Sequence, residues 1–208
     1  KTHLACFTYG GKGLKAAKIS EAKLISIRKR ELQNSADLLN ITKLYSPEFV
    51  DGELINQQDL VKERIAEYLS KVDPGAVITH DPSGKTGHPD HITLSSLIYE
   101  KLKKNQQQTT GYFVLPHPNY VKTFPNSSAK LKNTYSATHS LDIKPYLKQI
   151  YAAQLAHRSQ VDAGPQSWQL INFFDAEYYH RLQFSEPYKF RYQDFQGGKL
   201  SFSAKNHA

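Results

Sequence analysis

The chain has 208 residues, of which 39% are hydrophobic and 22% charged; this suits one α/β domain and excludes wholesale disorder. No apolar run approaches the roughly 18 residues of a membrane span, no signal peptide is evident, and the single cysteine, Cys6, excludes an intrachain disulfide, so we expect a cytoplasmic protein. The net charge of +8 suggests anionic partners, but the lysines are dispersed and no nucleic-acid motif appears. We therefore expect a solvated basic surface and no nucleic-acid partner.

The first part of the chain predicts strands that alternate with helices. Residues 2–8 are short, apolar and β-branched, which is typical of a strand, and residues 41–44 predict a second, shorter one. Between them, residues 20–39 have the apolar spacing of an amphipathic helix. Residues 57–72 predict another helix, with Leu60 among its inward residues.

The same alternation continues beyond this helix. Residues 76–79 predict a strand suited to burial on both faces, as in a parallel sheet. A loop at 81–87, rich in Gly, Ser and Pro, leads into a helix at 89–104, and residues 111–115 predict a further strand. One more helix is expected over 144–161.

This order predicts an α/β fold of Rossmann-like, three-layer α/β/α type with a mostly parallel sheet. Such sheets place their sites at the carboxyl ends of the strands, which points to the loops at 9–13 and 80–91. We expect residues 1–208 to form one domain whose C-terminal part, from about residue 166, is aromatic and irregular.

The sequence G-H-P-D-H at residues 87–91 carries the most chemistry. His88 and His91 are three apart, so both can lie on one side of a first helical turn, and neutral imidazoles bind zinc well. Asp90 lies in the same turn, where a carboxylate can orient an imidazole. A histidine that caps the helix beside a surface histidine explains the pattern equally well. The residues alone therefore indicate half a metal site.

Three other polar groups have simple explanations. The residues Y-G-G-K-G at 9–13 are not a P-loop and predict a turn that brings backbone close to a pocket. Arg28 and Glu31 predict a solvent-exposed ion pair by default, with an arginine aimed at a polar substrate as the alternative. The residues H-R-S-Q at 157–160 predict a polar helix end.

These segments, in this order, resemble the LmbE-like deacetylases, also called the N-acetylglucosaminyl-phosphatidylinositol de-N-acetylase (PIG-L) family. The resemblance is strongest at H-P-D-H and weakens after about Gln160. The matching stretches are F-T-Y-G at 7–10, I-R-K-R-E-L at 27–32, D-G at 51–52, D-P-G-A-V-I-T at 73–79, G-H-P-D-H at 87–91, H-R-S-Q at 157–160 and E-Y-Y at 177–179.

The resemblance implies removal of the acetyl group from an N-acetylated amino sugar or its conjugate, of the N-acetylglucosamine type. It makes His91 a ligand of zinc, with other divalent metals as alternatives. It makes His88 the acid or electrostatic partner at the reacting carbonyl, and Asp90 the carboxylate that supports this catalytic histidine. The substrate-binding residues that it implies are Thr8, Gly10 and Arg28.

One feature of the family is not found in this sequence. The family's other signature, H-P-D-D-E, supplies two metal ligands and a general base. We expect a first β-α unit with this segment to precede Lys1 in the natural protein. Two rivals stay open: a non-catalytic relative that binds a sugar-like ligand, and a basic nucleic-acid-binding domain. The oligomeric state also stays open, with a homo-oligomer among the options.

Overall fold

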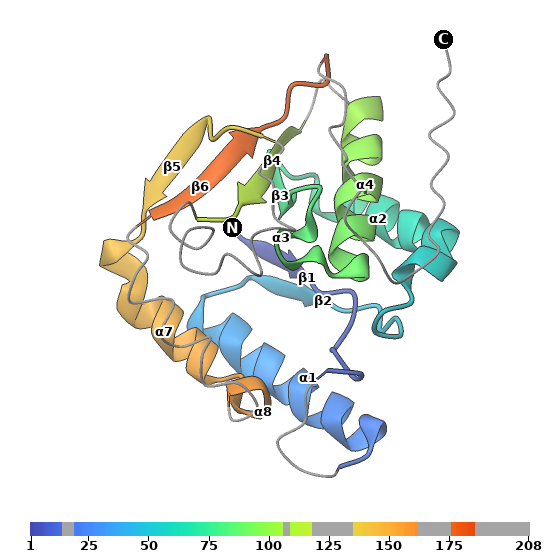
Figure 1. Ribbon diagram of the computed structural model, residues 1–208, viewed down its shortest axis with the longest axis vertical. Helices are drawn as coiled ribbons and strands as arrows, with labels where there is room; N and C mark the ends of the chain where they lie inside the picture. Colours follow the sequence, from blue (N-terminus) through green and yellow to red (C-terminus); the bar gives the residue numbers. More distant parts are fainter. Residues whose placement is uncertain (14–18, 106–108, 118–134, 162–175, 186–208) are drawn as a thin grey trace.

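The computed structural model describes residues 1–13, 19–105, 109–117, 135–161 and 176–185. Strands and helices alternate along most of this part of the chain, which confirms the α/β class (Figure 1). Helices α1 and α7 contact one another beneath the β1–β2 pair, whereas α2 and α4 pack together beside β3 (Figure 1). None of the described helices has the length and apolar character needed to span a bilayer.

The described strands form two sheets. In the smaller sheet, β1 and β2 are parallel, and an isolated bridge between Thr8 and Phe49 continues their pairing. The larger sheet has the order β3-β4-β6-β5. The strands are β1 (His3–Ala5), β2 (Lys43–Tyr45), β3 (Ala76–His80), β4 (Thr110–Leu115), β5 (His139–Asp142) and β6 (Ala176–Arg181).

The larger sheet is mixed, so the expectation of a mostly parallel sheet is wrong there. Strands β3 and β4 are parallel, but β6 runs antiparallel to both β4 and β5. A helix between two strands allows them to be parallel when it carries the chain back to the end of the sheet where the first strand began. Helix α4 does this between β3 and β4. The expected irregularity from residue 166 is also wrong at β6; residues 166–175 and 186–208 lie outside the described part.

The helices mostly begin and end near their predicted limits. Ser20 caps the first helix by accepting a hydrogen bond from the Lys23 N–H. The loop expected at 81–87 contains one short helix. The helical elements are α1 (Glu21–Leu38), η1 (Leu54–Gln57), α2 (Gln58–Val72), α3 (Gly84–Gly87), α4 (Pro89–Lys104), η2 (Lys144–Tyr146), α7 (Leu147–Leu155) and α8 (Arg158–Val161).

The single helix predicted over 144–161 is interrupted after α7. In an unbroken helix the backbone N–H of Ser159 would bond to the carbonyl of Leu155. It donates instead to the Glu31 carboxylate at 2.7 Å. A side chain from α1 thus takes the place of the helical acceptor, and the chain turns at His157 into α8.

Helix α4 connects the two sheets through the apolar core. Leu97 packs in a cluster with Phe7, which follows β1, and with Leu54 and Val61. Further along the same helix, Leu102 packs beneath β4 in a second cluster. The first turn of α4 is therefore fixed relative to the loops that follow β1 and β2.

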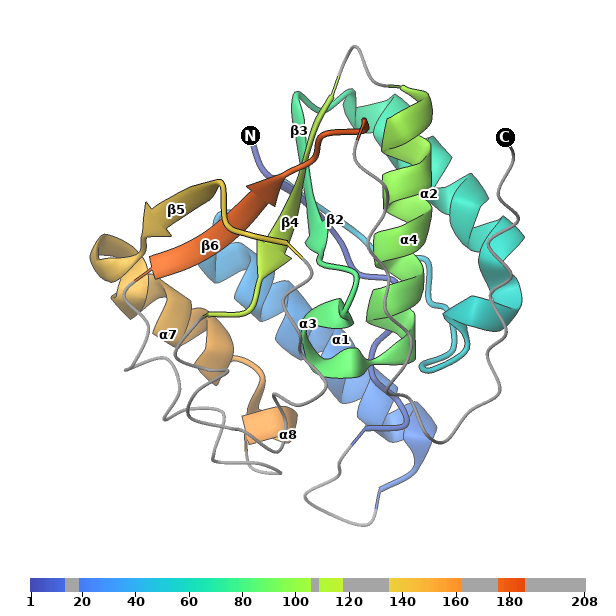
Figure 2. The ribbon, with the colours of Figure 1, turned by 45° about the horizontal axis from the view of Figure 1, so that its top comes forward.

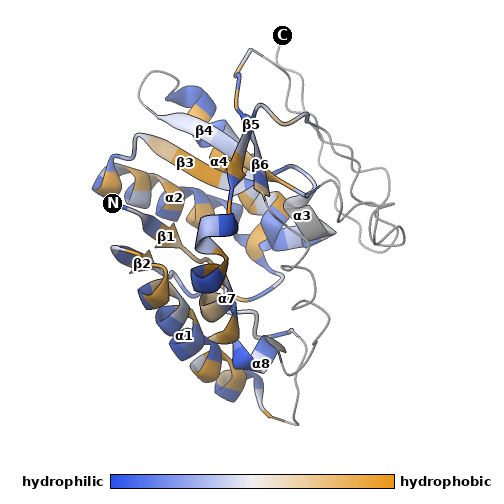
Figure 3. Cartoon of the chain, turned by 90° about the vertical axis from the view of Figure 1, so that its left-hand side faces the viewer, coloured by the Kyte–Doolittle hydropathy of each residue, from blue (hydrophilic) through white to orange (hydrophobic). Residues whose placement is uncertain are grey.

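Two expectations about burial are wrong. Leu60 on α2 is 53% exposed, and its neighbour Val61 is buried instead. Ile78 in β3 is 59% exposed, although most of this strand has the colour of hydrophobic residues in Figure 3. Side chains alternate between the two faces of a strand, and α4 packs against β3. It covers the face of Val77 and Thr79, which leaves the other face, with Ile78, open.

Candidate functional site

A pocket of about 320 Å³ lies where the loops after β1 and β2 meet the start of α4, the middle of α1 and α8. Figure 2 shows these elements converging at one end of the molecule. Five of the six predicted site residues line this pocket, while the sixth, Asp90, lies behind it. The five are Thr8, Gly10, Arg28, His88 and His91.

The pocket has two contrasting walls. We call Asp51, His88 and His91 the motif wall, because the H-P-D-H motif supplies most of it. We call Arg28, His157 and Gln160 the helix wall. Asp51 and Gln160 were not predicted to belong to the site. The prediction that residues 157–160 form only a polar helix end is therefore incomplete, because His157 and Gln160 line the pocket.

His91 on the motif wall is held in one tautomer. Its Nδ1 lies 3.0 Å from the carbonyl oxygen of Gly84 and must donate to it, because a carbonyl can only accept. The ring stacks on His80, with centroids 4.1 Å apart and planes at 10°. Burial lowers the pKa of His91 below its ordinary value, against the smaller opposing effect of the Gly84 bond. The ring is therefore neutral, and its Nε2 carries a lone pair.

Gly84 is required for this contact. Its φ is +65°, and a Cβ there would lie 2.9 Å from the Cβ of His91 and 3.1 Å from the backbone nitrogen of Ile92. Any larger residue would both strain the backbone and push the helix away. The Gly-rich loop between β3 and α4 thus sets the position and the tautomer of His91.

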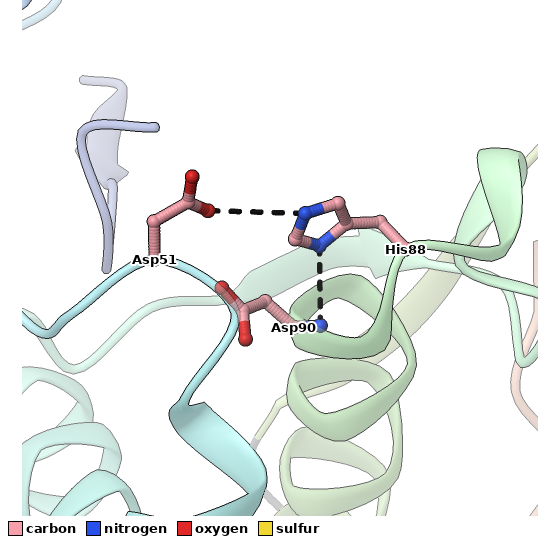
Figure 4. A group of neighbouring side chains, drawn as sticks. All are labelled: Asp51, His88 and Asp90. Carbon is pink, nitrogen blue, oxygen red and sulfur yellow. Dashed lines mark hydrogen bonds and ion pairs between the residues drawn. The ribbon is translucent and has the colours of Figure 1, made fainter. Parts of the chain in front are cut away.

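His88 has the opposite tautomer. Its Nδ1 accepts a hydrogen bond from the backbone N–H of Asp90 at 3.2 Å, so it caps α4 as the sequence allowed. An accepting Nδ1 carries no hydrogen, so a neutral His88 has its hydrogen on Nε2. This atom faces Oδ1 of Asp51 at 3.8 Å, which is too long for a hydrogen bond (Figure 4). His88 therefore presents an N–H donor at the pocket.

Asp90 uses its carboxylate elsewhere than on His88. One oxygen accepts the backbone N–H of Gly52 at 2.7 Å and the other that of Leu54 at 3.1 Å. Asp90 is only 2% exposed. A buried carboxylate with two charge-assisted bonds fastens the loop after β2 to the start of α4. Because Asp51 precedes Gly52 in this loop, Asp90 also holds Asp51 in position.

Asp51 brings a negative charge to the motif wall. Its Oδ2 accepts the backbone N–H of Lys12 at 3.0 Å, and its Oδ1 faces His88. Asp51, His88 and Asp90 each offer one metal-ligand atom, and these atoms lie within 4.8 Å of one another. His91 is not in this set. Both oxygens of Asp90 already accept hydrogen bonds, whereas Nε2 of His91 keeps a lone pair in the pocket that Asp51 also lines.

The helix wall overturns the expectation of a solvent-exposed Arg28–Glu31 pair. Arg28 is 7% exposed and Glu31 is 8% exposed. Arg28 donates to the carbonyl of Gly10 and, at 3.4 Å, to the hydroxyl of Ser159. Burial lowers the pKa of Arg28, whereas Glu31 and Asp51 raise it. A Cβ at Gly13 would lie 2.8 Å from the guanidinium, so the Gly-rich loop fits around Arg28.

His157 and Gln160 complete the helix wall. The side-chain amide of Gln160 lies 3.4 Å from Nδ1 of His157. Burial lowers the pKa of His157, and nearby Arg28 lowers it further, against the effect of Glu31. The wall therefore combines a fixed guanidinium, a neutral imidazole and an amide, which are hydrogen-bonding groups suited to a polar ligand.

The chain matches a known family in the region that builds the motif wall. Residues 1–102 match the family described as "GlcNAc-PI de-N-acetylase" (PIG-L). This confirms the resemblance carried by H-P-D-H. The PIG-L region includes β1 to β3 and nearly all of α4, and thus every residue of the motif wall.

Relatives of this chain are named as deacetylases. A 1D-myo-inositol 2-acetamido-2-deoxy-alpha-D-glucopyranoside deacetylase of Saccharomonospora viridis is 28% identical over 139 residues, which cover 60% of this chain and 50% of that protein. The diacetylchitobiose deacetylase of Thermococcus kodakarensis is 26% identical over 179 residues, covering 73% and 67%. The match to the first relative thus spans half of that protein's length.

A solved structure supports the fold. The N,N'-diacetylchitobiose deacetylase from Pyrococcus horikoshii aligns with a TM-score of 0.62 at 22% identity and covers 87% of this chain and 72% of that one. At this identity the likeness concerns the fold alone. It agrees with the α/β architecture of the described residues.

Proposed function

We propose that the protein is a zinc-dependent deacetylase that removes the acetyl group from an N-acetylated amino sugar or its conjugate. The observation that carries the proposal is the arrangement of His91, whose Nδ1 is bonded to a backbone carbonyl while Nε2 keeps its lone pair on the pocket wall. In proteins, a hydrogen bond from the other ring nitrogen is what usually orients a metal-binding histidine. The names of the relatives point to substrates of the N-acetylglucosamine type.

The chemistry of the donors suits a divalent cation. Zinc binds neutral imidazole nitrogen and carboxylate oxygen, and a catalytic zinc takes three protein ligands and keeps one open position. His91 would supply Nε2 and Asp51 would supply a carboxylate oxygen. Bound zinc, or another divalent metal, supplies Lewis-acid activation of water and of the amide carbonyl.

The other residues of the pocket would act on the substrate. Hydrolysis breaks the amide C–N bond and yields acetate and a free amine, and negative charge develops on the carbonyl oxygen on the way. The Nε2–H of His88 would donate to this oxygen, because Nδ1 is already committed to capping α4. Asp90 would act indirectly, since its carboxylate positions the loop that carries Asp51. Thr8, Gly10 and Arg28 would contact the sugar.

Acetate release tests the proposal. The protein should release acetate from N-acetylglucosamine or N,N'-diacetylchitobiose, lose this activity after chelation, and regain it when zinc is added back. Sugar binding without acetate release under these conditions would contradict catalysis and favour the non-catalytic relative. Acetate release that survives complete metal removal would contradict metal dependence.

A further inference from the structure

We propose that Glu31 is a positioning residue: through Ser159 it fixes α8 so that His157 and Gln160 recognise the hydroxyl groups of the sugar. This inference rests on the proposed function for the nature of the ligand. Glu31 accepts two hydrogen bonds from one residue, from the Ser159 backbone N–H at 2.7 Å and from its hydroxyl at 2.6 Å. These contacts join α1 to a segment 128 residues further along the chain.

The two hydrogen bonds fix the direction of α8. The backbone bond replaces the helical acceptor where the chain leaves α7, and the hydroxyl bond fixes the same residue from its side chain. His157 and Gln160 flank Ser159 and line the pocket, whereas Glu31 itself is not among the lining residues. A substitution at Glu31 can therefore affect a ligand in the pocket only indirectly. Ser159 is hydrogen-bonded directly to Glu31 and transmits the effect.

Arg28 makes the arrangement specific for a small hydroxyl residue. Its Nε donates to the Ser159 oxygen at 3.4 Å, while that hydroxyl donates to Glu31. The Ser159 hydroxyl thus lies between a buried cation and a buried carboxylate and uses both its donor and its acceptor capacity. Alanine at 159 would leave the Glu31 oxygen without this donor in a site that water reaches poorly.

The groups held in this way suit a sugar. If the Gln160 amide donates to Nδ1 of His157, the hydrogen of the neutral imidazole lies on Nε2. His157 then offers a donor and Gln160 an acceptor oxygen. Hydroxyl groups both donate and accept, so such a pair discriminates hydroxyl-bearing ligands by the cost of leaving its polar atoms unpaired.

Kinetics with N-acetylglucosamine and binding of glucosamine, the product amine, test the inference. Glu31→Gln and Ser159→Ala should each raise KM and weaken glucosamine binding, measured by ligand-observed NMR, by about tenfold, as expected for loss of a charge-assisted hydrogen bond. The value of kcat and the zinc content should change less than about twofold. The double variant should be no weaker than the single ones, because both remove one contact.

Two controls separate positioning from general destabilisation. Ser159→Thr keeps the hydroxyl and should keep KM. Asp37→Asn removes an exposed carboxylate that lies on α1 with Glu31 and accepts a hydrogen bond from Gln33, and it should change neither KM nor glucosamine binding. Unchanged KM in Ser159→Ala, or equal falls in kcat and zinc content, would overturn the inference. If the unsubstituted protein releases no acetate but Ser159→Ala still weakens glucosamine binding, the proposed catalysis fails and the positioning role stands.

Discussion

The two walls of the pocket are built in different ways. The motif wall takes His88 and His91 from a single helical turn, and its orienting contacts run to nearby backbone groups at Gly84 and Asp90. The helix wall joins Arg28 to residues of α8 across 131 positions of sequence. A short motif can therefore specify the groups proposed to hold metal and stabilise charge, whereas the groups proposed to hold the sugar depend on long-range packing.

The largest effect is expected where the motif wall loses its proposed metal ligand. His91→Ala removes Nε2, so zinc content and acetate release should fall together, with kcat/KM lower by more than about 100-fold, since even partners of ligands are worth 10- to 100-fold. Metal analysis and initial rates measure both. His139→Ala, an exposed histidine on β5, is the matched control and should retain both properties. Full zinc occupancy in His91→Ala would remove this residue from the ligand set.

His88 tests whether the two histidines of the motif wall have separate roles. His88→Ala should keep most of its zinc and lose about 10²- to 10⁴-fold in kcat, the usual contribution of an acid or base group. Zinc titration and single-turnover rates distinguish the two effects. If zinc is lost instead, the cluster of Asp51, His88 and Asp90 holds the metal and the assignment to His91 is wrong.

Asp90 tests how firmly the motif wall is attached to the loop after β2. In Asp90→Asn, an amide nitrogen would face the backbone N–H of Gly52 or of Leu54, so one buried donor loses its acceptor. The free energy of unfolding should fall by about 1–3 kcal/mol. Denaturant titration measures this, with Asp37→Asn expected within about 0.5 kcal/mol of the unsubstituted protein. Equal stability of the two variants would contradict the fastening role of Asp90.

The smallest effect concerns pH and the helix wall. Burial holds the pKa of His157 below its ordinary value, so the unfolded chain binds a proton at a higher pH than the folded one. Stability should therefore fall as pH decreases through about 6.5, the pKa of an unperturbed histidine. In His157→Gln, the unfolding temperature should decrease less steeply as pH falls, which thermal unfolding at a series of pH values measures. An unchanged slope would mean that His157 is not held neutral by the fold.

The sequence predicted the motif wall better than the helix wall for a physical reason. Residues 88–91 act within one helical turn, where sequence spacing gives spatial spacing directly. Asp51 was noted only within the matching stretch D-G at 51–52, because Asp-Gly is typical of turns whether or not its carboxylate faces a pocket. Glu31 and Ser159 look unremarkable in their own segments, and only tertiary packing brings them together. The spacing of Arg28 and Glu31 was visible in the sequence, but their burial was not.

The fold shows the same limit at β3 and β6. The apolar composition of residues 76–79 correctly predicted a strand, but the exposure of Ile78 depends on which neighbours cover each face. Strand β6 is tyrosine-rich and has no clear alternation, so its pairing with β4 could not be deduced from its own residues. Local pattern identifies elements; it does not determine their neighbours.

The interruption between α7 and α8 has a consequence for protein engineering. The segment from His157 to Gln160 is attached to α1 chiefly through Ser159, while the H-P-D-H turn belongs to α4. A designer can therefore graft or randomise positions 157 and 160 as a cassette, keeping Ser159 as its anchor and leaving α4 untouched. Selectivity among sugars then becomes adjustable in a region that shares no backbone with the proposed catalytic histidines.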